Sequence, residues 1–158
     1  ELQFSRDIDG GAFPGDADGD VNDANEIVRY ALDADTDDDG VFNNLPCDLG
    51  RATGAAGGLQ TLGENIDALN FVYLGADNDA DGDPDILGPL PLNAANRNNI
   101  RAIQVTIVAR AAQRGMVKAV SDNRAYQNQQ GDLIFQAGGE DVRRLQLSKT
   151  IACRNMGL

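Results

Sequence analysis

Histidine and tryptophan are absent from the 158 residues, and only two cysteines are present. Without histidine the chain lacks the commonest general base and metal ligand, so Ser-His-Asp and Cys-His catalysis are excluded. Two cysteines without histidine also supply too few of the usual ligands for a zinc site. A carboxylate enzyme is the catalytic class that is left, and no pair of carboxylates in the sequence stands out for that role.

Basic side chains are scarce as well. The chain has 13 lysines and arginines and 25 aspartates and glutamates, which gives a formal net charge of −12. Such a surface repels nucleic acid and anionic membranes, and it suits divalent cations and basic partners. Hydrophobic residues make up 42 % of the chain, which is enough for a globular core, and the length suits one domain.

Long apolar runs are absent too, so the sequence contains neither a membrane span nor a signal-peptide core. The even cysteine count in an acidic chain suited to calcium predicts one disulfide, Cys47–Cys153, over the alternative of two unrelated buried thiols. A disulfide implies an extracytoplasmic protein. Because export requires a signal, we expect that an N-terminal segment has been removed.

Alternating apolar and polar residues predict several β-strands. The clearest segments are 65–75, 100–111 and 140–155, and two weaker ones are 26–32 and 41–52. In the last strong segment Leu145, Leu147, Ile151 and Cys153 share one face, a pattern typical of a half-buried antiparallel strand. Residues 113–132 are polar and predict irregular structure.

The first nine residues predict the end of a helix. Leu2, Phe4 and Ile8 are its apolar positions, and a glycine pair follows. Together with the strands this predicts an α+β fold, with a truncated N-terminal helix packed on an antiparallel sheet with long acidic loops. We expect a single domain over 1–158, divided into the helix end (1–9), a loop-rich region with early strands (10–98) and C-terminal strands (99–158).

Four segments in order resemble the type IV pilin superfamily, most closely PilW-type minor pilins. They are "LQFSRDIDGGAF", "NEIVRYAL", "NIRAIQVTIVARA" and "DVRRLQLSKTIACRNMGL". The resemblance implies a helical spine lying against an antiparallel sheet, and a disulfide near the C-terminus. It also implies that a leader and an apolar helix were removed to give this domain.

The function implied by this resemblance is structural and non-enzymatic. Such a subunit takes part in pilus assembly or priming through contacts with other pilin and minor-pilin subunits, and touches the membrane only through its missing helix. It would lie at the extracellular or periplasmic face of the inner membrane before assembly, and in the pilus afterwards. The alternatives are a pseudopilin of type II secretion, a calcium-dependent cell-surface adhesive or binding module, and a carboxylate hydrolase.

Three acidic stretches are candidate calcium sites. The strongest is "DNDADGDPD", in which Asp77, Asp79 and Asp81 hold positions 1, 3 and 5 of an EF-hand-like loop and Gly82 holds position 6. Asp83 and Asp85 follow at positions 7 and 9. Position 12 is a glycine, so the bidentate glutamate is missing. A solvated turn is the alternative, since aspartate, asparagine and glycine favour turns.

The other two stretches repeat this spacing less completely. One contains Asp35, Asp37 and Asp39, and the other contains Asp16, Asp18 and Asp20. Each has the same alternative of a solvated turn. The sequence thus predicts structural Ca²⁺ as the cofactor of acidic loops.

Overall fold

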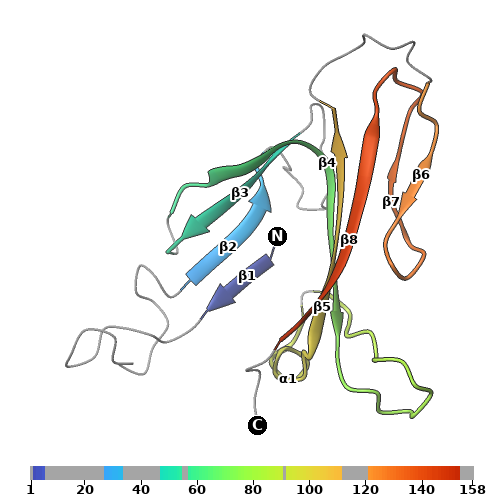
Figure 1. Ribbon diagram of the computed structural model, residues 1–158. Helices are drawn as coiled ribbons and strands as arrows, with labels where there is room; N and C mark the ends of the chain where they lie inside the picture. The colour runs from blue at the N-terminus through green and yellow to red at the C-terminus, as the bar shows by residue number, and fades with distance from the viewer. Residues whose placement is uncertain are drawn as a thin grey trace.

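The regular structure of the described residues is antiparallel β-sheet apart from one short helix. The computed structural model describes residues 2–5, 27–33, 47–54, 57–90, 92–111 and 121–153. Six strands form one sheet in the order β1-β2-β3-β4-β5-β8, and a hairpin of two further strands lies against it (Figure 1). The strands are β1 (Leu2–Ser5), β2 (Ile27–Leu32), β3 (Cys47–Thr53), β4 (Gln60–Leu74), β5 (Ala102–Arg110), β6 (Ala125–Gln127), β7 (Leu133–Gln136) and β8 (Arg144–Ala152).

The predicted α+β class, with a helix over residues 1–9, is wrong. Residues Leu2–Ser5 form β1, an edge strand paired with β2. The only helix in the described residues is α1 (Ala94–Asn98), five residues long, at the end of the region 10–98 that we predicted to be loop-rich. Leu2 and Phe4 are two residues apart, which is the strand period. A run this short does not distinguish the helix period from the strand period. Pairing with β2 makes it a strand.

The five predicted strands are confirmed as β2, β3, β4, β5 and β8. The two strands of the hairpin are not among them. Strand β6 falls in residues 113–132, which we predicted to be irregular, and β7 follows it. With three and four residues, they are too short for alternation to show in the sequence.

Strand β4 is shared between the two halves of the sheet. Its first part, up to Ile66, pairs with β3, and the remainder pairs with β5. Ile66 lies opposite Ala109 and Ala68 lies opposite Val108, so Asp67 is an extra residue, a β-bulge. A bulge redirects a side chain that regular alternation would place elsewhere. Here it places the carboxylate of Asp67 inside the protein.

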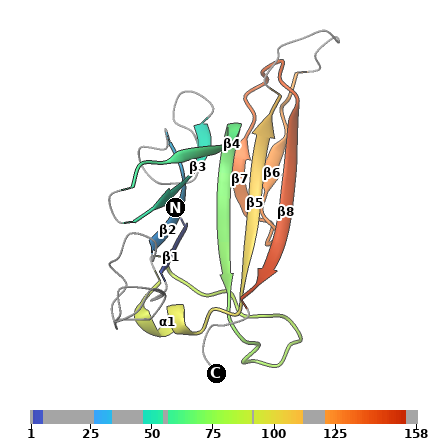
Figure 2. The same cartoon turned by 60° about the vertical axis from the view of Figure 1, so that its left-hand side comes forward.

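The β6–β7 hairpin covers one face of β4, β5 and β8 (Figure 2). Tyr126 and Phe135 pack there with Ala137 against Ala68 and Val108, and the two ring centroids are 6.0 Å apart. Both sheet residues are fully buried. Aromatic side chains bury the most surface of any residue type, so this layer is the centre of the hydrophobic core in this half of the molecule.

The opposite face of the same three strands is also apolar, and we call it the apolar face. The register lines up Leu69, Ile107 and Leu147 across the sheet, and likewise Tyr73, Ile103 and Ile151. The full set is Leu69, Phe71 and Tyr73 of β4, Ile103, Val105 and Ile107 of β5, and Leu145, Leu147, Lys149 and Ile151 of β8. This confirms the predicted alternation along all three strands.

The apolar face is buried at one end and open along β8. Leu2 of β1 packs against Ile103 and is buried with it. Along β8, by contrast, Leu145, Leu147 and Ile151 are 61 %, 57 % and 53 % exposed. We predicted a half-buried strand, with these side chains together on one face. They are more exposed because the helix expected to cover them is instead a strand at the far edge of the sheet.

Candidate functional site

The acidic loop after β4 folds back on itself. The Gly75 N–H donates to the carbonyl of Asp85 at 2.8 Å, which closes the loop. Inside it, Asp77 Oδ2 accepts from the Gly82 N–H at 3.0 Å, and the side-chain amide of Asn78 donates to Asp85 Oδ2 at 2.6 Å. Gly82 has φ of 100°, a left-handed conformation that glycine adopts without strain. The predicted turn at this glycine is therefore formed.

Three of the five predicted ligands in this loop lie together. Carboxylate oxygens of Asp77, Asp79 and Asp85 are within 4.8 Å of one another. Asp81 and Asp83 are outside this group, and Asp81 Oδ1 accepts the N–H of Asp83 at 2.9 Å. The hard oxygen donors fit calcium, which needs further oxygens from carbonyls or water to reach six to eight ligands. Exposed acidic groups also occur without an ion, so calcium here stays a prediction.

Calcium should raise the melting temperature through this loop. With a dissociation constant on the order of 10⁻⁴ M and a tenfold excess of calcium, linkage adds about 1.4 kcal/mol of stability, or roughly 3–6 °C. Asp79→Asn should lose the loop's share of that rise. The control Asp83→Asn removes the same charge outside the group and should keep it. An unchanged melting temperature, with no heat of binding in calorimetry, would identify a solvated turn.

The other predicted ligands cannot be placed in this way. Asp35, Asp37 and Asp39, and likewise Asp16, Asp18 and Asp20, lie outside the described residues.

The two cysteines are not bonded to each other in the structure, so the predicted disulfide stays a prediction. Cys47 on β3 pairs with Ile66, which pairs in turn with Ala109 near the end of β5. The N–H of Cys153 donates to the carbonyl of Arg101, just before β5 begins. Eight residues of extended strand span roughly 26 Å, whereas a disulfide joins Cα atoms less than about 7 Å apart. Sequence separation alone does not report this distance.

A buried network of ion pairs centres on Arg144 at the start of β8. Its Nε donates to Asp67 Oδ2 at 2.5 Å, and its two terminal nitrogens donate to Asp122 and Glu140, both at 3.2 Å. Arg110 of β5 donates through Nε to the other oxygen of Asp67, also at 2.5 Å. The side chains of Arg144 and Asp67 are fully buried. Charges taken out of water are tolerated only when paired in this way.

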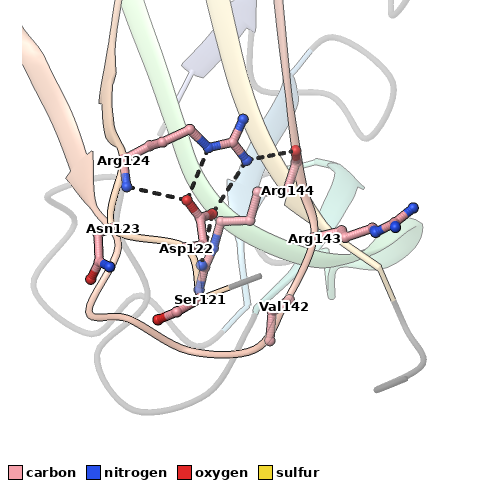
Figure 3. Close-up of a pocket in the computed structure, with 7 residues that line it drawn as sticks. All are labelled: Ser121, Asp122, Asn123, Arg124, Val142, Arg143 and Arg144. Carbon is pink, nitrogen blue, oxygen red and sulfur yellow. Dashed lines mark hydrogen bonds and ion pairs between the residues drawn. The ribbon is translucent and has the colours of Figure 1, made fainter. Parts of the chain in front are cut away.

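Asp122 extends the network to the hairpin (Figure 3). Arg124 Nε donates to its Oδ1 at 2.9 Å, and the Tyr126 hydroxyl donates to its Oδ2 at 2.7 Å. The hydrogen bond from Arg124, helped by Tyr126 and Arg144, holds the pKa of Asp122 well below its usual range although burial opposes this. Burial and the bond to Asp122 raise the pKa of Tyr126 to about 12. The carboxylate is thus ionised and the phenol neutral at physiological pH.

A pocket of about 430 Å³ opens over this network and is lined by Ser121, Asp122, Asn123, Arg124, Val142, Arg143 and Arg144 (Figure 3). Asp122, Arg124 and Arg144 are hydrogen-bonded to one another or to Asp67, and Arg124 also donates to the carbonyl of Arg144 at 3.3 Å. Groups engaged in this way fix the hairpin to the end of β8.

For the Arg143-Arg144 pair, the sequence favours exposure to solvent over ion pairing with nearby aspartates. The structure assigns one to each, with Arg144 buried and paired and Arg143 exposed. The strand period alone predicts this split, since neighbours on a strand point to opposite faces. Nothing in the sequence indicated that Asp67 and Asp122 belong to this network, because the bulge and the hairpin that bury them leave no recognisable sequence pattern.

No protein-family model, curated protein or solved structure matches this chain. Among the described residues, no helix has the length and apolar character needed to cross a membrane. The resemblance to pilins therefore depends on the four sequence segments alone, and it stays a prediction.

Proposed function

We propose that this chain is a non-enzymatic structural subunit of a type IV pilus, of the PilW-type minor-pilin kind, which acts outside the cytoplasm by contact with other subunits. The observation that supports this is the open part of the apolar face. Three large apolar side chains of β8 are each more than half exposed on a chain with 25 acidic residues. Contiguous exposed apolar surface of this kind marks protein contact sites.

The dimensions of the apolar face suit one helix. The open part runs along β8, whose nine residues extend about 30 Å, beside the partly buried Val105 and Ile107 of β5. A helix of about 20 residues has this length and a diameter of about 10 Å. We therefore assign the face to an apolar helix of a neighbouring subunit.

Lys149 adds a specific requirement for that partner. It lies on the apolar face between Leu147 and Ile151, opposite Val105 of β5. An ammonium group buried without a counter-charge is costly, so the docking helix should present a carboxylate or its C-terminal carbonyls at this point. This requirement separates a specific subunit contact from nonspecific adhesion to an apolar surface.

The variant Leu147→Glu tests the proposed function. A carboxylate in the middle of the apolar face should block the docking helix, while the exposed position leaves the fold intact. In a strain that lacks the wild-type gene, this variant should fail to restore surface pili, with counts at least tenfold below those given by the wild-type gene. Pili are counted by electron microscopy.

The matched control is Leu133→Glu. Leu133 lies on the hairpin strand β7 and is 59 % exposed, almost the same as Leu147. This variant should restore piliation. Full piliation with Leu147→Glu, or normal piliation in the deletion strain itself, would contradict the proposal.

The grouping of Asp77, Asp79 and Asp85 favours a second candidate, a calcium-dependent adhesive module of the cell surface. In that case adhesion would depend on calcium and would fall in Asp79→Asn, while piliation would be unchanged in the deletion strain. A pseudopilin of type II secretion would use the same apolar face, and its loss would reduce secretion and leave pili intact.

A further inference from the structure

The backbone of β8 has one side paired and one side open. The Ala111 N–H donates to the carbonyl of Arg143 at 2.9 Å, and the Cys153 N–H donates to the carbonyl of Arg101 at 2.8 Å. Both contacts use odd-numbered residues of the β8 segment. Because backbone groups alternate sides along an antiparallel strand, the even-numbered residues direct their N–H and C=O away from β5.

In the part of the chain that the structure describes, that outer side has no backbone partner over most of the strand. At its start the carbonyl of Arg144 accepts from Arg124, which confirms that even-numbered carbonyls point outward. Beyond it, no described residue bonds the outward backbone groups of Gln146, Ser148 and Thr150. Figure 2 shows β8 as the outer edge of the sheet, with the hairpin behind it and no other described strand beside it. An open strand of this length is a template for pairing with another strand.

We propose that the β8 edge pairs antiparallel with β8 of a second copy of this chain, in a two-fold register centred on Ser148. This register places Ser148 opposite itself and Gln146 opposite Thr150. It pairs outward-directed backbone groups only with outward-directed ones, which antiparallel pairing requires. The six-stranded sheets of the two copies then join into one continuous sheet.

The side chains of β8 are self-complementary in this register. On the apolar face Leu145 lies opposite Ile151 of the second copy, and Leu147 lies opposite Lys149. On the other face the pairs are polar. Cross-strand pairs of like character stabilise a sheet, and the aliphatic stem of Lys149 can pack on leucine while its ammonium group reaches solvent. A register shifted by one residue would put apolar side chains opposite polar ones on both faces.

The charge distribution permits this contact. The chain as a whole carries −12, which opposes self-association, but β8 carries Arg144 and Lys149 and no acidic residue. Repulsion between more distant acidic groups is screened beyond about 8 Å at physiological ionic strength. The edge that meets the second copy is thus the least acidic of the long strands. The pairing does not rest on the proposed function. Its hydrogen bonds use the backbone edge of β8, whereas the docking helix covers the side chains of the apolar face.

Sedimentation equilibrium of the full chain over a dilution series tests the dimer. We expect a molecular mass of twice 16.8 kDa for the wild type, and the mass of one chain for Ser148→Pro. Proline removes an outward N–H, which edge strands tolerate. The control Ser148→Ala keeps that N–H and loses the same hydroxyl contact to Thr106, 3.1 Å away, so it should remain dimeric. A monomeric wild type, or a folded Ser148→Pro dimer, would overturn the proposal.

Cross-linking tests the register without relying on proline. A mixture of Leu147→Cys and Lys149→Cys chains should form a disulfide-linked heterodimer under mild oxidation, because these positions face each other. Leu147→Cys alone should remain uncross-linked, as should the wild type with its two native thiols. Strong cross-linking of Leu147→Cys alone would refute this register. Leu147→Glu should remain dimeric through a pair with Lys149, so loss of pili and loss of the dimer can be told apart.

Discussion

Replacing Arg144 with methionine should lower the free energy of unfolding by about 3–5 kcal/mol, the usual cost of removing one partner from a buried ion pair. The guanidinium bonds Asp67 and Asp122, both buried. Without it, Asp67 keeps one arginine partner and Asp122 keeps Arg124, so two buried carboxylates lose part of their charge compensation. Urea denaturation measures the loss as a lower midpoint at an unchanged slope.

The neighbouring arginine provides the control. Arg143 has the same side chain one position earlier and is exposed. Arg143→Met should therefore stay within about 0.5 kcal/mol of the wild type, as is usual for surface substitutions. If both variants lost the same amount, or if Arg144→Met cost under about 1 kcal/mol, the network would contribute no more than a surface ion pair.

Phe135→Ala should destabilise the protein by a similar amount, about 3–5 kcal/mol. The ring is 8 % exposed, lies in the layer between hairpin and sheet, and has the Arg144 guanidinium 5.0 Å from its centroid. Truncation removes the buried ring, leaves a cavity beside Tyr126 and loses the cation–π contact. Near-ultraviolet circular dichroism should weaken at the same time, because Tyr126 loses its packed environment.

Leu133→Ala is the matched truncation on the same strand. Leu133 lies two residues before Phe135 and is 59 % exposed. Its loss should cost less than about 1 kcal/mol. Equal costs at the two positions would mean that the hairpin does not pack on the sheet through Phe135.

The long strands could be predicted from the sequence because burial of one face imposes alternation. Ile103, Val105 and Ile107 alternate with polar residues along β5, and this pattern needs no knowledge of the partner strands. The start of the chain could not be predicted in the same way. Four residues of β1 carry too few apolar positions to fix a period, and pairing with a strand more than 20 residues away determines their conformation.

The candidate sites also differ in how far the sequence predicts them, according to whether their residues are close together in the chain. The acidic loop is local, so its spacing predicted a turn in which Asp77 and Asp79 approach each other. The ion-pair network is not local, since Asp67 and Arg144 are 77 residues apart and meet only because β4 bulges at Asp67. The disulfide prediction also concerns residues that are distant in sequence. Cysteine count carries no information on position within a sheet, and the two thiols lie near opposite ends of β5.

The detour of the chain between β5 and β8 has a consequence for the order of folding. Strands β1 to β5 follow one another both in the chain and in the sheet, whereas β8 reaches β5 only after the hairpin. Closing the longer loop costs more chain entropy, so β8 should dock after the other strands. During synthesis it is also the last described strand to leave the ribosome. Until β8 docks, β5 is the edge of the sheet and Asp67 has only Arg110 as an ion-pair partner. The second partner, Arg144, joins when β8 pairs with β5.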